Sequence, residues 1–486
     1  MRFCIKNIIA LCLSFTLLTS ISACAIEEIT IEKDSIVTIN DCIRIALENS
    51  PIIKRFKYNY GVSKSNVGIA KAAYFPTLGV STGYTFNDTA SSSRYSRNMT
   101  GTNNYNVQAS LNQLIWNFGK TNANIRMQKF NLITALFNFD DGVLDTIYEV
   151  KTNYYGVLAA KAAVDINKAN VQINERNYQR TKAYFDEGIR SKIDLVNAEV
   201  NLSDSKVTLV NAEKAYKNAM VTLNNSMYIA FTPDYEITPT ETFNLSTYTI
   251  DLEELDKRNN LDTLPEDVQD ATLTSSVEKT DIITDYKFEE FPYTFEKSVE
   301  LAYKNRPDLK AYDATLKAME ENLLYIKREY FPELSASAGY GYRNMNSTSS
   351  FNVGVTLSSS VNILSKKHEI DSGKLQVKLA QNEIDLLKQN VYFEVQNAYV
   401  NMIELEKQIP LLAVKVRQTL ENFELADGRY AVGLGDFIEL QDAKVQYNNA
   451  QHNYVQTVYN YNVARAALEK AMALPQDVTI AIEDVN

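Results

Sequence analysis

Few side chains in this sequence have the type and spacing that catalysis or metal binding requires. His368 and His452 are the only two histidines, and neither has a cysteine or a second histidine at metal-ligand spacing. The sequence has neither a G-x-S-x-G motif nor a phosphate-binding P-loop. We therefore expect no enzyme, no cofactor and no metal site, and we interpret both histidines as structural or surface residues.

An acidic pair is the sharper candidate for a functional site. Glu439 and Asp442 lie three residues apart in a predicted helix just after a turn at Gly433, so they share one face. Asp194 stands at the matching place in an earlier helix. Such acids could simply stabilise a helix N-terminus, by roughly 0.3–1 kcal/mol. Whether they form a functional surface instead depends on the elements that carry them.

Those elements are two long predicted helices with the same heptad seam. In the first helix, small and apolar residues recur in steps that alternate between three and four. They are Leu195, Ala198, Leu202, Ser205, Leu209, Ala212, Tyr216, Ala219 and Leu223. The second seam, from Leu440 to Leu468, is displaced by 245 residues at every position. A generic coiled coil would explain one seam, but the constant displacement indicates a duplicated chain.

The parts of the chain that precede the two seams are also repeats of each other. Pro51 and Pro307 are 256 residues apart, and Phe75-Pro76 recurs as Phe331-Pro332 at the same displacement. The polar loop between the strands is shorter in the second copy, around residues 344–350. This explains why the displacement between matching residues is 256 before the loop and 245 after it. We predict a first repeat over residues 26–228 and a second over 293–474.

Each predicted repeat contains two strands and one very long helix. The period of two predicts strands at about 77–87, 104–116, 333–343 and 351–362, with a polar loop before residue 104. The long helices run from Lys120 to about Phe185 and from about Lys367 to Tyr430, with a kink expected at Pro410. At 1.5 Å per residue each is about 100 Å long. A short turn then returns the chain as an antiparallel helix.

The first 25 residues are typical of an export signal. Arg2 and Lys6 precede an apolar core over residues 8–21, which is too short to span a bilayer usefully. Two processing sites overlap: cleavage after Ala25, or a lipobox that would place a lipid on Cys24. The sequence leaves both open. At most Cys24 and Cys42 remain after processing, so no disulfide framework is implied.

An acid-rich segment lies between the two repeats, and the net charge of the chain argues against nucleic acid as a partner. Residues 229–292 lose the helical pattern and are rich in acids, which predicts a solvated linker or small equatorial insertion. Residues 475–486 form a short tail. The chain carries a net charge of −11, which argues against nucleic acid because a phosphate backbone needs a basic face.

The predicted strands have one apolar face and one face of small and polar residues. An ordinary soluble sheet could have this pattern, but it is also what a membrane β-barrel shows, apolar toward lipid and polar toward the lumen. A barrel in lipid must close, because edge N–H and C=O groups find no water there. Four strands cannot close around a lumen. Several copies of the chain would therefore share one barrel.

Taken together, these features resemble the TolC-type outer membrane efflux protein family. The resemblance rests on the paired helix starts, the paired Phe-Pro junctions and the paired turns 185–188 and 430–433. Each turn leads into a similar helix start, at Asp194-Leu195 and Glu439-Leu440. It covers essentially the whole mature length.

The resemblance implies a fold, a location and partners. It implies a mainly α chain whose long antiparallel coiled-coil helices form an α-barrel, with four strands per protomer in a 12-stranded β-barrel shared by a homotrimer. Such a channel-tunnel lies in outer membrane lipid, extends into the periplasm, and exports small molecules or proteins. It works with a periplasmic adaptor protein and an inner-membrane transporter. The competing interpretation is a non-conducting periplasmic coiled-coil scaffold anchored to the envelope.

The resemblance also assigns roles to four residues. Acids at the positions of Glu439 and Asp442 ring the periplasmic aperture, where stacked anionic rings would favour cations. Asp194 and Tyr430 match residues that latch the closed tip. The sequence departs from the family pattern at Gly435, where a latch arginine is expected.

Overall fold

The structure is a computed structural model that describes residues 35–93, 96–229, 235–238, 291–343, 348–360 and 362–475. The predicted signal over residues 1–25, with Cys24, lies outside the described residues. So do residues 239–290 of the predicted linker and residues 476–486 of the predicted tail.

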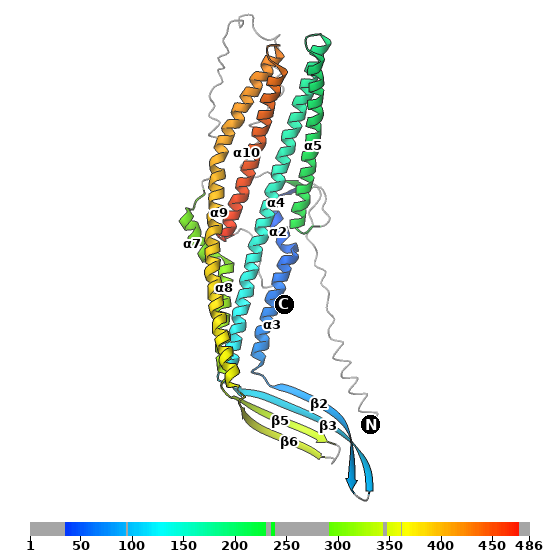
Figure 1. Ribbon diagram of the computed structural model, residues 1–486, viewed down its shortest axis with the longest axis vertical. Coiled ribbons are helices and arrows are strands. Elements are labelled where there is room, and N and C mark those ends of the chain that lie inside the picture. The colour runs from blue at the N-terminus through cyan, green and yellow to red at the C-terminus, as the bar shows by residue number, and fades with distance from the viewer. Residues whose placement is uncertain are drawn as a thin grey trace.

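Two long helical hairpins dominate the molecule (Figure 1). The first consists of α4 (Lys120–Asp186) and α5 (Lys192–Ser226), and the second of α9 (Ile363–Ala431) and α10 (Phe437–Ala471). Helix α9 continues through Pro410 as one element. In the part of the chain that is described, none of the helices contains a stretch apolar and long enough to cross a membrane.

Shorter helices complete each repeat. They are α2 (Ile39–Asn49) and α3 (Pro51–Ala72) in the first repeat, and α7 (Phe295–Asn305) and α8 (Pro307–Arg328) in the second. Proline at the first position of α3 and α8 suits a helix start, because that N–H has no intrahelical partner. Helix α3 packs on α4, and α8 packs between α4 and α9. The duplication inferred from the sequence is thus present in the fold.

Four strands form one antiparallel sheet in the order β2-β3-β5-β6. The strands are β2 (Thr77–Ser93), β3 (Ser96–Trp116), β5 (Glu333–Arg343) and β6 (Thr348–Ser358). The sequence prediction of a polar loop up to residue 104 was wrong, because β2 and β3 pair from Thr77↔Asn112 as far as Ser93↔Ser96. The outer part of this β2–β3 hairpin extends beyond the part of β3 that pairs with β5. Its many Ser, Thr and Asn residues lack the apolar alternation that predicts a strand. Strand β6 also begins and ends earlier than predicted.

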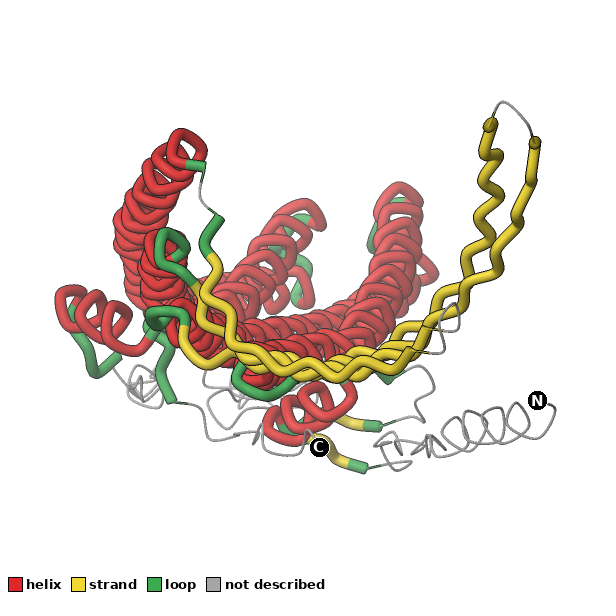
Figure 2. Tube along the Cα trace, turned by 90° about the horizontal axis from the view of Figure 1, so that it is seen from below, coloured by secondary structure: helices red, strands yellow, loops and turns green. Residues whose placement is uncertain are grey.

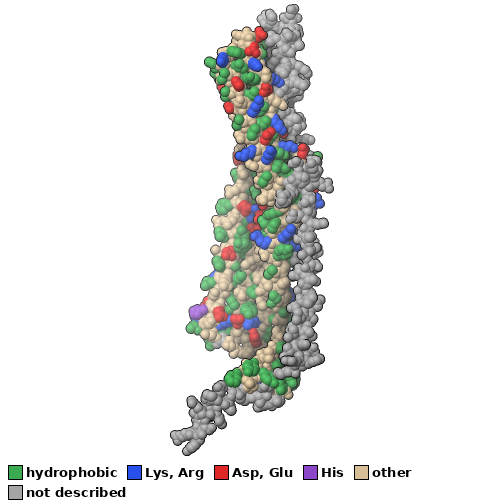
Figure 3. All heavy atoms as spheres, turned by 90° about the vertical axis from the view of Figure 1, so that its right-hand side faces the viewer, with side chains coloured by type: hydrophobic (Ala, Val, Ile, Leu, Met, Phe, Trp, Pro, Cys, Tyr) green, Lys and Arg blue, Asp and Glu red, His purple; other side chains and the backbone are tan. Residues whose placement is uncertain are grey.

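The sheet has two chemically different faces. Paired residues Leu78, Val80 and Tyr84 on β2 are exposed and apolar, as are Phe351 and Val353 on β6. On the other face, Gly83 leaves room for Asn106, whose Oδ1 would lie 2.6 Å from an added Cβ. Figure 2 shows that the sheet curves into an arc and that the helices continue this arc. In Figure 3 hydrophobic side chains gather at the sheet, whereas charged ones are spread over the helices.

The two heptad seams differ in burial, although their sequences match. Leu440, Ala443, Tyr447 and Ala450 on α10 are all buried, since α10 packs against both α9 and α4. On α5 the two ends of the seam are buried, at Ala198, Leu202, Ser205 and Leu223, but the middle stays half-buried, at Leu209, Ala212, Tyr216 and Ala219. Helix α5 lies at one edge of the chain and packs mainly on α4, so its seam has room for another element (Figure 1).

A small two-stranded sheet joins the start of the first repeat to the start of the predicted linker. Strand β1 (Ile36–Val37) pairs in parallel with β4 (Glu236–Ile237), within the region predicted as a linker. The Tyr154 hydroxyl of α4 donates a hydrogen bond of 2.8 Å to the carbonyl oxygen of Thr238. The start of the acidic linker is therefore attached to the helical wall, and the loss of helical pattern there did not reveal this strand.

Candidate functional site

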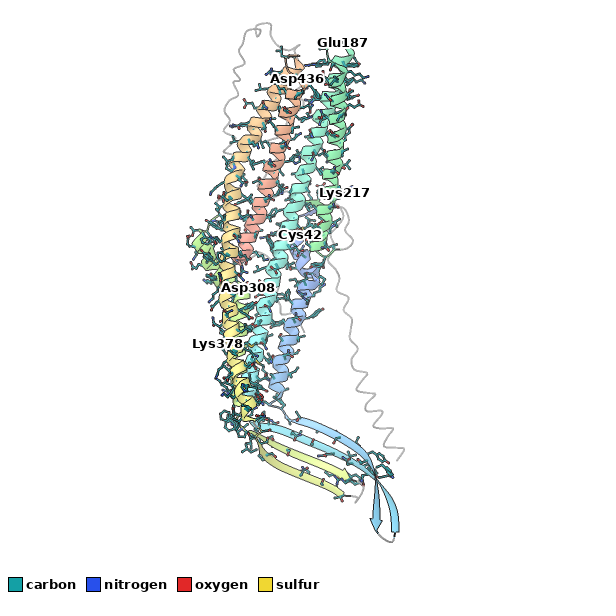
Figure 4. The ribbon with its side chains drawn as sticks, in the orientation of Figure 1. Cys42, Glu187, Lys217, Asp308, Lys378 and Asp436 are labelled. Atoms are coloured by element: carbon teal, nitrogen blue, oxygen red, sulfur yellow. The ribbon has the colours of Figure 1, made fainter. Side chains whose placement is uncertain are left out.

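The candidate site lies at the end of the molecule farthest from the sheet, where both hairpins turn. Figure 4 labels Glu187 and Asp436 in these two turns, close to the same end. Gly188 and Gly433 have φ angles of 74° and 79°, a conformation that glycine adopts at little cost. We call this region the tip, and define it as residues 177–197 and 427–442.

Tyr430 is the centre of the tip. Its side chain is fully buried, and its hydroxyl lies 3.0 Å from Thr181 Oγ1 of α4. The guanidinium groups of Arg180 and Arg190 lie 5.2 and 4.6 Å from the centre of its ring, which attracts cations. Tyr430 therefore joins the last turn of α9 to the first hairpin of the same chain.

A largely buried ion pair lies one helical turn from Tyr430, on the side toward the sheet. The carboxylate of Asp427, which is 2% exposed, pairs with the guanidinium of Arg180. Arg180 also donates a hydrogen bond of 2.8 Å to Asn177 Oδ1. Loss of one partner of a buried pair leaves an uncompensated charge, so this contact makes the approach of α4 and α9 specific.

Arg190, which precedes Gly435 by the repeat displacement of 245 residues, contacts Gly435 across the two turns. Its guanidinium donates a hydrogen bond of 3.0 Å to the carbonyl oxygen of Gly435. A Cβ added to Gly435 would lie 2.9 Å from the backbone nitrogen of Tyr430, so this close approach requires glycine.

The predicted acidic residues have three different environments. Asp194 accepts hydrogen bonds from the backbone and hydroxyl of Ser191, and so forms the capping box of α5. Glu439 is exposed and pairs with Arg429 at 3.2 Å. Asp442 is exposed on α10. The structure does not bring the four predicted residues into one cluster: Tyr430 is inside the hairpin contact, and the acids lie on its surface.

Next to the tip, on the side toward the sheet, polar side chains line the contact between α4 and α10. Lys444 is buried, and its ammonium donates a hydrogen bond of 2.5 Å to Asn174 Oδ1. Burial lowers the pKa of Lys444 to about 8. The contact between the two hairpins is therefore more polar than the seam within the second hairpin.

Sequence reasoning missed Arg180, Asp427 and Arg190. Two signals could have found them. Asp427 follows the buried Phe423 by four residues and so falls on the core stripe of α9, where an acid needs a partner. Arg190 stands opposite Gly435 at the repeat displacement of 245. Across the described residues, no group of three or more His, Cys, Asp or Glu side chains could hold a metal ion.

Comparison with known proteins decides the family. The model for the outer membrane efflux protein family matches residues 42–227 and 299–474, one segment in each repeat. The chain belongs to the outer membrane efflux protein family. Its place is the outer membrane, from which it extends into the periplasm, and its fold class and family are those predicted from the sequence.

Solved channels share the fold at low sequence identity. The outer membrane channel CmeC of Campylobacter jejuni is 16% identical with a TM-score of 0.70, over 89% of this chain and 85% of that one. The open state of the MtrE channel from Neisseria gonorrhoeae is 18% identical with a TM-score of 0.67, over 89% of this chain and 88% of that one. VceC of Vibrio cholerae is 14% identical with a TM-score of 0.68, over 89% of this chain and 95% of that one. No curated protein matches the chain significantly in sequence.

Proposed function

We propose that this efflux-family protein is a homotrimeric channel-tunnel that conducts small molecules or proteins across the periplasm and outer membrane. A periplasmic adaptor and an inner-membrane transporter would deliver the substrate, as part of a tripartite efflux pump or a type I secretion system. The two predicted repeats, residues 26–228 and 293–474, would form equivalent parts of the wall.

The observation that carries this proposal is the open, two-faced sheet. Strands β2 and β6 are the edges of the four-stranded sheet. An apolar outer face suits lipid, but open edges do not, because their N–H and C=O groups would be unsatisfied there. Two copies would give a barrel of eight strands, and the side chains of such a barrel fill its interior. Three copies, with twelve strands, are the smallest set that leaves a lumen.

The helical edges match the sheet edges. On one side, α5 exposes β-branched residues with heptad-like spacing: Ile193, Val196, Val200, Val207 and Val210. On the other side, α9 exposes larger residues seven apart: Leu379, Leu386, Phe393 and Val400. The α5 stripe lies within about 30 Å of the tip turn and the α9 stripe lies nearer the sheet, so a different helix of the next copy would cover each. Unlike surfaces on opposite edges generate a closed ring rather than a two-fold dimer. The half-buried seam of α5 would be completed by α9 of the next copy.

The tip would form the periplasmic aperture. In a ring of three copies, Glu439 and Asp442 would be repeated as anionic rings that favour cations. Asp194 and Tyr430 would belong to the latch that holds the tip closed. For Tyr430, burial between two arginines supports this role; for Asp194, its capping bonds to Ser191 offer a purely structural explanation.

The turns suit an adaptor with helical hairpins. Ile189 and Leu434 follow the two turn glycines and are 64% and 78% exposed. Aliphatic side chains so exposed at both turns would contact the ends of a coiled-coil partner.

The lipidation of Cys24 stays a prediction that the mass of the mature N-terminal peptide will decide.

Planar-bilayer recording of the purified protein tests the proposal. We expect discrete, cation-selective conductance steps. The competing scaffold interpretation predicts a protein that binds the envelope without conducting, and the absence of conductance from correctly folded protein would favour it.

A further inference from the structure

A cavity of about 470 Å³ lies in the wall of the helical part, below the tip hairpins and away from the aperture residues. Its walls come from α4, α8 and α9, with Tyr303 of α7 at one side. Figure 4 labels Asp308 at the start of α8, directly before the first α8 residue of the cavity. All these elements belong to one chain, so the cavity does not depend on the proposed trimer.

The floor of the cavity is apolar. Helix α4 contributes residues spaced along one face, and α8 and α9 contribute buried aliphatic side chains. The floor residues are Phe130, Ile133, Phe137, Leu309, Ala314 and Ile384. The volume lies within the usual range of ligand pockets, about 300–1,000 Å³.

The rim of the cavity is cationic, although the whole chain is acidic. Lys310, Lys317 and Lys388 line it together with one acid, Asp313. Lys317 pairs with Asp313 at 2.5 Å. The Lys310 ammonium lies 5.9 Å from the ring centre of Phe137 and donates a 2.9 Å hydrogen bond to the carbonyl oxygen of Asn305. Asp140 of α4 also lies close enough to Lys310 to interact with it electrostatically, so three ammonium groups face two carboxylates and one positive charge remains in excess.

We propose that this cavity binds an amphiphile with one anionic head group and one acyl chain. The apolar floor would remove the acyl chain from water. The lysines at the mouth would pair with a carboxylate or phosphate while their aliphatic stems extend the apolar surface. A neutral amphiphile would gain only from burial of its chain, and a small anion would gain only from pairing with the lysines. A ligand that has both an acyl chain and an anionic head group gains from both.

Photo-crosslinking tests the proposal with the full-length protein held in nanodiscs of zwitterionic phosphatidylcholine, without an anionic amphiphile that would compete. The probes are a diazirine-bearing palmitic acid and the corresponding alcohol, and labelled peptides are mapped by mass spectrometry. We expect the acid to label segments 130–137 or 309–317 at least tenfold more than the alcohol. Competition with unlabelled palmitate and with lysophosphatidic acid distinguishes a carboxylate from a phosphate head group.

Two kinds of variant make the test specific. Ile133→Trp places a large side chain at a partly exposed floor position, and we expect it to abolish labelling. Lys310→Glu with Lys388→Glu should reduce labelling about tenfold. Lys407→Glu is the matched control on α9, because Lys407 is exposed and lies outside the cavity. Equal labelling by acid and alcohol, labelling unchanged by the cavity variants, or no competition by either lipid would overturn the proposal.

Discussion

At the scale of single residues, the tip shows how charge and burial join two hairpins. Tyr430 and Asp427 are buried and Arg180 beside them is partly buried, whereas Glu439 and Asp442 are exposed. The first group determines how α4 and α9 fit, and the second determines what potential the surface presents. The two groups should therefore respond differently to mutation.

Breaking the buried ion pair should loosen the tip. Asp427→Ala leaves the Arg180 guanidinium buried without this carboxylate, and breaking a buried pair typically costs about 3–5 kcal/mol. We expect larger or more frequent openings in bilayer recordings, and increased uptake of large antibiotics by cells. Glu404→Ala is the control on the same helix, because its pair with Lys407 is exposed and worth at most about 1 kcal/mol. Equal effects of the two variants would contradict the assignment.

Removing the exposed acids should change selectivity without opening the tip. Arg429 partly compensates Glu439 at 3.2 Å. We therefore expect Asp442→Asn to reduce the cation-to-anion permeability ratio more than Glu439→Gln does. Reversal potentials in a salt gradient measure this ratio, with Glu404→Gln as the control. A ratio that stays constant in all three variants would leave only the helix-stabilising role for the tip acids.

Asp141 of α4 should make stability depend on pH. Burial first, then Asp145 and Asp308, raises the pKa of Asp141 to about 6. Since the pKa is higher in the folded state, ionisation opposes folding, and stability is lost as pH rises from about 4 to 6. Asp141→Asn should raise the thermal midpoint at pH 7 and remove part of this pH dependence.

The control for this prediction has the opposite sign. A hydrogen bond from Lys374 lowers the pKa of Asp371, so its contribution is present above the unfolded-state pKa and is lost in acid. Asp371→Asn should not stabilise the protein at pH 7. A thermal midpoint that Asp141→Asn leaves unchanged or lowers would contradict the pKa argument.

At the scale of elements, the packing of α3 on α4 depends on one glycine. A Cβ at Gly142 would lie 2.5 Å from the ring of Phe56, so the two helices approach only because position 142 has no side chain. Gly156, fourteen residues on in the same helix, has no heavy atom within 4 Å of an added Cβ.

Two alanine substitutions in α4 should therefore have opposite effects. Gly142→Ala should lower the thermal midpoint, because the Phe56 ring must move. Gly156→Ala should raise stability by roughly 0.5–1 kcal/mol per chain through helix propensity. Circular dichroism melts of both variants measure this, and a stabilising Gly142→Ala would show that the ring adapts freely.

The helices and strands were predictable to different degrees. The long helices α4 and α9 and both seams followed from the periodicity of apolar residues, whereas the caps at Ser50 and Ser191 were found only in the structure. The outer part of the β2–β3 ribbon was missed, since its polar residues have no apolar alternation and pair only with each other beyond β5. Arg180 and Asp427 were missed because they are 247 residues apart and only the folded hairpins bring them together.

At the scale of the whole molecule, one chain presents an incomplete wall. The sheet ends at β2 on one side and β6 on the other, and the helices end at α5 and α3 opposite α9 (Figure 1). The apolar stripes on α5 and α9 lie on opposite edges, and a ring of identical copies would cover both stripes at every junction. Closure of this ring is the central claim, since both the lumen and the aperture depend on it.

The native mass of the protein extracted from outer membranes in mild detergent tests closure most directly. We predict a particle of three chains that resists dissociation, because each junction would pair strand edges and bury two apolar stripes. A monomer, or protein released from the envelope without detergent, would contradict the shared barrel and leave the coiled-coil scaffold as the better account.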